Sequence, residues 1–475
     1  MVRTRHVKRK EVTYSSAKKA KANMLIAIED DVHTYKQFST TCGAIQLYWR
    51  NLLRITSVLM RFPILHRVGE YFRPGNADEK IRCEAGTYTW LNENCPSMPT
   101  PKLYGFALST GQTFTAAENL SWLPRYFHYI RCRILNLFGR PVPSKYVRHQ
   151  GPCFDILNAG YLLIEYIDQC RVQRIGSFVI DDNGFLVLNN RPLSVEIPEL
   201  EGKQIPVDIP RDIIYSSVDS YVTDILAFHD SRFAQQPNAL KDSTDGAFKA
   251  AALTTMRAVS SYFFKRALRW GPFIYVLNDL HQSNILVDEE WNIISLIDLE
   301  YACSRPIEML HPPYWFTSPH MNTIDVDHYT AAHREFMTLM EQQEEELYAD
   351  TSVSSIVKNG LGNGSFWYSL ALQSPTGLED IFYDHIETIF TQDNDPYFIK
   401  VTYKFWKSDM DAFIASKVKD KAAYDTRLQE EFHIGSDTND SPIIDLAECS
   451  TVGMPHPDQI VSDSVRHYPW RHIPN

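Results

Sequence analysis

The chain has 475 residues, of which 44% are hydrophobic and 22% charged, and its formal net charge is −11. These values are ordinary for a globular protein of two or three domains, and the acidic balance argues against a general nucleic-acid binder. No run of 18 apolar residues occurs, so no membrane partner is expected. The eight cysteines contain no C-x-x-C pair, which favours a reducing, cytoplasmic location.

The first 21 residues differ from the rest of the chain in charge. They hold eight Lys or Arg residues against one acid, Glu11. We expect residues 1–34 to form a basic, disordered tail, and the alternative is a nuclear-import or anionic-surface patch. The residues from 426 to the end are polar and rich in turn formers, and we expect a second tail there.

A strand and a helix are predicted near the beginning of the folded part. Residues 55–62, ITSVLMRF, read as a strand, and residues 73–94 read as a helix whose Asn76 and Glu79 resemble a capping box. On this helix Ile81, Glu84, Tyr88 and Leu91 share one face. A carboxylate in an apolar stripe needs a cation, and Arg61 is the candidate partner of Glu84.

Residues 106–155 form a long segment rich in aromatic and basic residues, including WLPRYFHYIRCRILNLFGR. Such a run can stack on and neutralise a nucleic acid or an anionic ligand. The favoured interpretation is an insertion helix whose aromatic side chains pack and whose arginines face water. After it, GYLLIEYID at 160–168 reads as a buried strand.

A helix is predicted over residues 247–272, with Ala252, Met256, Val259, Phe263 and Ala267 on one stripe and Gly271-Pro272 as its stop signal. It leads into VLNDLHQSNILVDEEWNIISLIDLE at 276–300. A further helix is predicted over residues 322–348.

The segment 276–300 predicts a β-hairpin with polar groups at its open end. NILV and IISLID are β-type runs joined by the polar turn DEEWN. Pairing about residue 290 would place Asn284 opposite Ile297 or Asp298, and Asp279 could fold back over the same end. Converging carboxylate and amide oxygens are suited to magnesium, so the pattern predicts a phosphotransfer site.

The motifs DLHQSN and LIDLE resemble the catalytic segment of the aminoglycoside phosphotransferase and choline kinase branch of the protein-kinase-like superfamily. The ordered set NADEKIRCEAGTYTWL, PKLYGFALSTGQTF, RIGSF, NRPL and CSRPIEMLHPPYW is similar to fungal members of that group, over residues 55–420. The resemblance implies an α+β, two-lobed fold. Its small antiparallel-sheet N-terminal lobe with the hinge would span 35–167, and its mainly helical C-terminal lobe 168–425.

The resemblance also implies roles for individual residues. Asp279 would be the catalytic aspartate, and Asn284 and Asp298 would bind Mg²⁺. Arg61 and Glu84 would form the basic residue–glutamate pair of the small lobe. Backbone groups of Glu165 and Ile167 would meet the adenine of ATP. The expected activity is transfer of the γ-phosphoryl group of ATP to a hydroxyl of a small molecule. His281 is expected to hold the catalytic loop by a hydrogen bond.

Three features depart from the family pattern. Leu277 stands where the family has a histidine, Arg61 replaces a lysine, and residues 35–55 contain one glycine, Gly43, and no recognisable phosphate-covering loop. A catalytically impaired, nucleotide-binding pseudokinase therefore stays open as an alternative. A metal-dependent phosphoesterase built on Asp279, His281 and Asp298 is a third, less favoured one. The acceptor is not indicated; aminoglycosides, choline-like alcohols and sugars are all compatible.

Overall fold

The computed structural model describes residues 10–12, 14–21, 23–25, 60–61, 63, 65, 68–95, 98, 100–150, 161–163, 171–172, 174–288, 293–318, 324–346, 353–391, 396–432 and 444–446. These residues form a mixed α+β structure in which every pair of neighbouring strands is antiparallel. No helix in this described part is long and apolar enough to cross a membrane.

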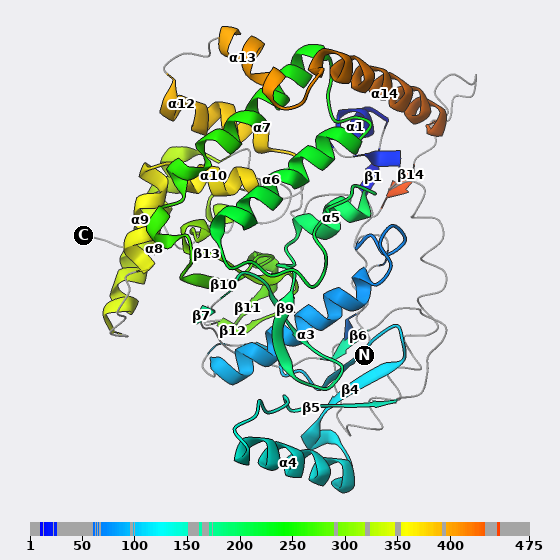
Figure 1. The fold of residues 1–475 in the computed structure, drawn as a ribbon, viewed down its shortest axis with the longest axis vertical. Helices are drawn as coiled ribbons and strands as arrows, with labels where there is room; N and C mark the ends of the chain where they lie inside the picture. Colours follow the sequence, from blue (N-terminus) through cyan, green and yellow to red (C-terminus); the bar gives the residue numbers. More distant parts are fainter. Residues whose placement is uncertain are drawn as a thin grey trace.

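The strands are β1 Lys10–Val12, β2 Met60–Arg61, β3 Gly105–Ala107, β4 Gln112–Ala116, β5 Tyr146–Gln150, β6 Tyr161–Leu163, β7 Arg171–Val172, β8 Ser177–Ile180, β9 Leu186–Asn190, β10 Phe273–Leu277, β11 Ile285–Val287, β12 Ile293–Leu296, β13 Ala302–Pro306 and β14 Ile444–Leu446. The helices are α1 Tyr14–Lys19, α3 Asn76–Asn94, α4 Trp122–Leu137, α5 Glu196–Gly202, α6 Val218–Gln235, α7 Ser243–Phe263, α8 Val326–Glu346, α9 Val353–Gly362, α10 Ser365–Leu372, α11 Leu378–Ile381, α12 Glu387–Phe390, α13 Pro396–Thr402 and α14 Met410–Glu431. Figure 1 shows most of the strands toward one end of the molecule, together with α3 and α4, and helices such as α7, α13 and α14 toward the other.

A five-stranded sheet in the order β2-β6-β3-β4-β5 forms the smaller part of the structure. Phe106 of β3 lies opposite Phe114 of β4, and their rings stack in a core that also contains Ile81, Tyr88 and Leu91 of α3. The predicted apolar stripe of α3 is therefore confirmed. Because β4 and β5 belong to this sheet, the described residues from 106 to 150 are not one insertion. Among them, α4 and its connections stand apart from the strands.

The predicted capping box at the start of α3 is wrong. The residue before the helix is Gly75, with a left-handed φ of 92°, and the helix has no side-chain cap from that position. Instead the carboxylate of Glu70 accepts hydrogen bonds from the backbone nitrogens of Gly75 and Ala77, at 2.6 and 2.7 Å. This carboxylate satisfies helix-terminal N–H groups that would otherwise lack partners.

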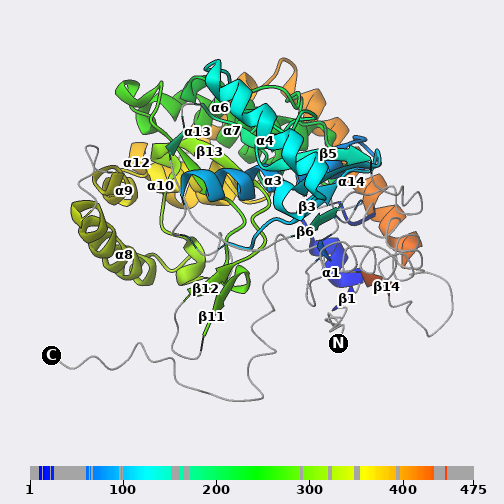
Figure 2. The same cartoon turned by 90° about the horizontal axis from the view of Figure 1, so that it is seen from below.

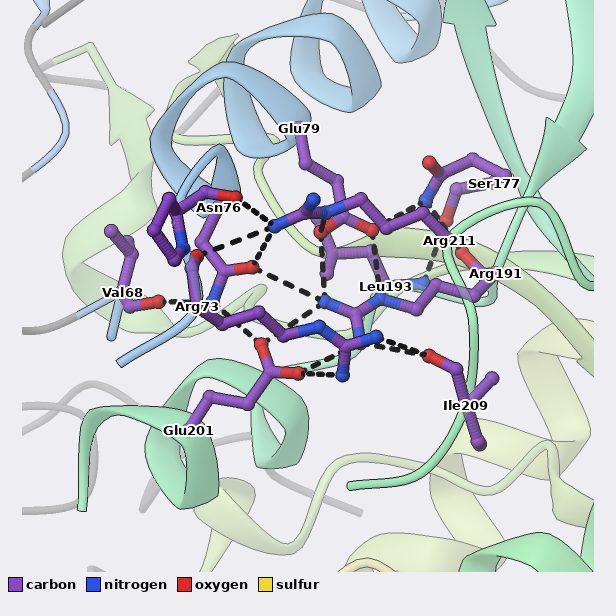
Figure 3. Close-up of polar contacts among 12 residues, drawn as sticks. Val68, Arg73, Asn76, Glu79, Ser177, Arg191, Leu193, Glu201, Ile209 and Arg211 are labelled. Atoms are coloured by element: carbon purple, nitrogen blue, oxygen red, sulfur yellow. Dashed lines mark hydrogen bonds and ion pairs between the residues drawn. The ribbon is translucent and has the colours of Figure 1, made fainter. Parts of the chain in front are cut away.

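Glu79 is diverted from capping because it binds arginine. Arg191, fully buried just after β9, bonds both Glu79 oxygens at 2.8 Å and the two Glu201 oxygens at 2.9 and 3.1 Å. Arg73 and Arg211 reach the same carboxylates from the surface side (Figure 3). These ion pairs and hydrogen bonds connect the first turn of α3 to the residue after β9 and to α5.

A second core lies among the helices and includes α6, α7 and α10. In α7 the predicted stripe is confirmed for Ala252, Met256 and Phe263, which are buried. The predicted end of the helix is wrong, because α7 ends at Phe263 and Ala267 lies outside it. The helix begins instead after Asp242, whose carboxylate accepts a hydrogen bond from the Asp245 nitrogen at 2.9 Å. The helix predicted at 322–348 is confirmed as α8.

The expectation of a disordered N-terminal tail is wrong for part of the segment. Ala17, Met24 and Leu25 are buried against Tyr424 and Leu428 of α14, and β1 pairs with β14. These apolar residues pack against α14, whereas the prediction of disorder rested on the high positive charge of the segment. Helix α14 likewise runs to Glu431, beyond the expected boundary at residue 425.

Candidate functional site

The predicted hairpin exists and has the predicted register. Strands β11 and β12 pair with Ile285 opposite Leu296, and the backbone nitrogen of Ile297 donates to the oxygen of Asn284 at 2.9 Å. Figure 2 shows this ribbon projecting from the body of the molecule. The pairing places Asn284 beside the residues that precede Asp298, as the sequence predicts.

Three carboxylates meet near the base of the hairpin. One oxygen from each of Asp279, Asp298 and Glu300 lies within 4.8 Å of the other two. Asn284 is buried, and its amide nitrogen donates to the backbone oxygen of Asp279 at 2.8 Å. The structure therefore brings together Asp279, Asn284 and Asp298, and it adds Glu300, which sequence reasoning did not single out.

Two cations from the smaller part of the structure face these carboxylates. Arg61 on β2 forms ion pairs with Glu84 on α3 and with Asp298, and its guanidinium lies 2.9 Å from Glu300. Lys80, one turn before Glu84 on α3, donates to Glu300 at 2.8 Å. The predicted Arg61–Glu84 pair is thus confirmed, and it extends to a residue 237 positions further along the chain.

Burial dominates the electrostatics of this cluster. Burial raises the pKa of Asp279 to about 8, and the Glu300 and Asp298 carboxylates add to the effect. Burial also raises the pKa of Glu84 above its ordinary range, although Arg61 opposes this. Burial would lower the pKa of Arg61, but Glu84, Glu300 and Asp298 outweigh it and raise the pKa. Asp298 and Glu300 are paired with Arg61 and Lys80, so a metal ion would compete with these two side chains for the carboxylate oxygens.

The backbone at the cluster adopts unusual conformations. Asp298 and Tyr301 have φ values of 64° and 60°, in the left-handed region that non-glycine residues seldom occupy. Such conformations cost of the order of 1–3 kcal/mol and persist where the surroundings enforce them, often at functional sites. Here they turn the chain sharply between β12 and β13, where both Asp298 and Glu300 lie.

The loop that carries Asp279 is held by neighbours rather than by a histidine. Leu277 is the last residue of β10, opposite Ala302. The side chain of Asn278 donates to the backbone oxygen of Tyr301, and the Trp315 indole nitrogen donates to the oxygen of Leu280 at 2.8 Å. These bonds support the loop on both sides of Asp279, without a histidine at position 277.

His281 does make a hydrogen bond in this loop, as predicted, but a local one. Its Nδ1 lies 2.7 Å from the hydroxyl of Ser283, two residues away. Glu165 and Ile167, the predicted adenine contacts, lie outside the described residues. Weak signals existed for the two groups that were missed: Glu300 is two residues after Asp298, and Lys80 is four residues before Glu84, on the same helical face.

Two cavities of about 560 and 520 Å³ lie elsewhere in the described part of the chain. The first is lined by residues that include Asp230, Arg257 and Trp406, and the second by Asp245 and Tyr383 among others. Neither borders the carboxylate cluster. We assign the candidate site to the cluster rather than to either cavity because carboxylates and cations from distant parts of the chain converge there.

A comparison of the chain with protein-family models, with curated proteins and with solved structures gives no match. The geometry of the cluster is therefore the ground on which a function is proposed.

Proposed function

We propose that this protein is an ATP- and magnesium-dependent phosphotransferase that acts on a hydroxyl of a small molecule, with a two-lobed protein-kinase-like fold. The observation that carries the proposal is the convergence of Asp279, Asn284 and Asp298 at one end of a hairpin. The Arg61–Glu84 pair faces them from a different sheet and helix.

The residues present fit a hard divalent cation. Asp298 and Glu300 offer carboxylate oxygens, and Asn284 would offer its amide oxygen, because its amide nitrogen is bonded to the Asp279 backbone. Magnesium binds such oxygen donors and keeps several waters or substrate phosphates. When bound, it would neutralise the charge on the transferred phosphoryl group.

Asp279 is suited to orienting a hydroxyl and accepting its proton. A buried carboxyl with a pKa near 8 titrates close to neutral pH, where a base accepts a proton most effectively. A cation bound by Asp298 and Glu300 would offset the repulsion between these carboxylates and the Asp279 carboxylate, and would so lower the pKa of Asp279. Most of the catalysis would come from positioning and charge neutralisation, as phosphoryl transfer requires.

Arg61 would hold phosphate oxygens through its planar guanidinium, which binds such groups in a bidentate manner. Glu84 is almost fully buried, and its pairing with Arg61 fixes the guanidinium beside the carboxylate cluster. Helix α3 thereby sets the distance between the two parts of the site.

A specific observation also favours the second candidate, a non-catalytic nucleotide-binding module. Arg61 is already paired with Asp298 and Glu300, so a nucleotide must compete with both carboxylates for the guanidinium. A protein of this kind would bind ATP without transferring its phosphoryl group.

Thermal denaturation tests the nucleotide binding that both candidates require. We expect ATP with magnesium to raise the melting temperature by a few degrees, because a ligand at 100 times its Kd adds about 2.7 kcal/mol. ATP with a chelator should have little effect. Asp298→Ala should abolish the magnesium-dependent shift, whereas Asp212→Asn, at an exposed loop position, should leave it unchanged.

Turnover is then measured as ADP release with a panel of amino sugars, choline-like alcohols and sugars. Asp279→Asn should keep the ATP shift and lose ADP release with any acceptor that the wild-type protein uses. ATP binding without release for every acceptor would favour the binding module. No magnesium-dependent ATP shift in the wild-type protein would refute both candidates.

A further inference from the structure

Helix α4 presents an apolar surface to solvent. Its most exposed large side chains are Trp122, Tyr126, Phe127, Leu137 and the adjoining Phe138, which are 74, 58, 63, 83 and 72% exposed. The expectation that these aromatic residues pack is therefore wrong. Isolated exposed apolar side chains are common on protein surfaces, but a contiguous group of this size marks an interaction site.

The orientation of α4 is fixed from its other side. Arg125, His128, Cys132 and Leu135 recur at helical spacing, and they are the buried or half-buried residues of that side. Arg125 donates to the backbone oxygens of Ala117 and Leu120, at 3.2 and 2.9 Å. The inner face of α4 is thus attached to the body, and the apolar face is held outward.

A second attachment lies near the middle of the helix. Arg131 donates to the backbone oxygen of Asn183 at 3.2 Å, and its guanidinium lies 5.2 Å from the centre of the Phe185 ring. Figure 1 shows α4 at the outer end of the molecule, beyond β5. In this position a large, flat partner could reach it without meeting the helical part.

The charged side chains of the α4 segment itself are all basic. No Asp or Glu occurs from residue 119 to residue 154, although the chain as a whole carries −11. Arg133 and Arg140 are exposed. An apolar face with Trp, Phe and Leu and with flanking arginines is the pattern of helices that lie in the interface of an anionic bilayer.

We propose that α4 is a membrane-surface helix, which binds the headgroup region of an anionic lipid bilayer with its apolar face inserted. Sixteen residues span about 24 Å. That length, with arginines inside it, suits a helix lying in the plane of the interface rather than crossing it. The absence of a spanning helix in the described residues does not bear on binding of this kind. The proposal replaces the expectation of no membrane partner, which rested on the lack of a spanning run.

Charge complementarity argues for lipid over the other occupants. A second copy docked face to face would bring two segments with only basic charges together, and like charges repel. Nucleic acid would meet a surface in which Leu and Ile separate the aromatic rings, so it offers no continuous platform for stacked bases. Anionic lipid offers both acyl chains for the apolar face and negative headgroups for the arginines.

The test uses the full chain and vesicles of phosphatidylcholine, with and without about 30% phosphatidylserine. We expect co-sedimentation with the anionic vesicles and weak binding to the neutral ones, with binding that falls as salt rises. Leu137→Ser combined with Phe138→Ser should weaken the partition at least about tenfold, because both side chains insert. Phe405→Ser, at a side chain that is 76% exposed in a different region, is the matched control and should change nothing.

A second readout locates the helix in the bilayer. A spin-labelled lipid should quench part of the tryptophan fluorescence, and that part should be lost in Trp122→Phe, which keeps the apolar contact. The exposed positions ensure that these variants fold, as circular dichroism would check.

Three outcomes overturn the proposal: no binding of the wild-type protein to anionic vesicles, equal partition of the double variant, or a concentration-dependent dimer that the double variant abolishes. The membrane assay contains no ATP, so its result is independent of the proposed phosphotransfer activity.

Discussion

Replacement of Arg191 tests how much its buried ion pairs with Glu79 and Glu201 contribute to stability. Arg191 is fully buried, and its guanidinium is bonded to both oxygens of Glu79 and both oxygens of Glu201 (Figure 3). Arg191→Met preserves much of the side-chain volume but removes the charge. The Glu79 and Glu201 side chains are at most 2% exposed. In the variant their negative charges are balanced in part by Arg211 and Arg73.

The expected loss of stability follows from this geometry. Removing one partner of a buried ion pair costs about 3–5 kcal/mol, since it leaves a buried charge uncompensated. We expect about 3 kcal/mol, because Arg73 still bonds Glu201 and Arg211 still bonds Glu79. The matched control is Arg73→Met. Its side chain is 30% exposed, so its ion pair is screened by water and its loss should cost about 1 kcal/mol.

The assay is urea denaturation followed by circular dichroism at several pH values. Burial alone would raise the pKa of Glu201, but Arg191 and Arg73 outweigh it and hold the pKa below its ordinary value. A depressed carboxyl pKa contributes stability that is present above the unfolded-state value of 4.5 and is lost as the pH falls below it. The difference between wild type and Arg191→Met should therefore shrink below pH 4.5. Equal losses for Arg191→Met and Arg73→Met, or a pH-independent difference, would refute this reasoning.

Three further changes test separate parts of the structure. Gly86→Ala should destabilise the protein by about 3 kcal/mol in urea titrations, because the new Cβ would lie 2.2 Å from the Phe178 backbone oxygen. Gly362→Ala, with open space around it, should be neutral or stabilising. Equal effects of the two substitutions would contradict the packing argument. Burial lowers the pKa of His229 to about 4, whereas the histidine of the unfolded chain titrates at 6.5. The free energy of unfolding of the wild type should therefore fall by about 1.4 kcal/mol per pH unit between pH 6.5 and pH 4. His229→Gln should lack this pH dependence, and the same pH dependence in both proteins would argue against the role given to His229. Glu300→Gln should weaken magnesium binding in a titration at constant ATP, and unchanged magnesium affinity would remove Glu300 from the ligand set.

Local sequence patterns were sufficient for the elements that carry the candidate site. The stripe of Ile81, Glu84, Tyr88 and Leu91 predicts the buried face of α3 because a helix repeats every 3.6 residues. The hairpin register beside Asn284 follows from two β-type runs about one polar turn, because antiparallel pairing about that turn sets which residues lie opposite each other. Where a competing long-range partner exists, as Arg191 does for Glu79, the local capping signal fails.

By itself, then, the sequence determined which residues form α3, α8 and the β11–β12 hairpin, and it singled out Arg61, Glu84, Asp279, Asn284 and Asp298. Only the tertiary structure decided that Lys80 and Glu300 join them, that Arg61 reaches Asp298, and that the apolar face of α4 points to solvent. The physical reason is the range of the interactions. Helix and hairpin periodicity act between residues a few positions apart, whereas ion pairs and burial depend on which distant segments pack together.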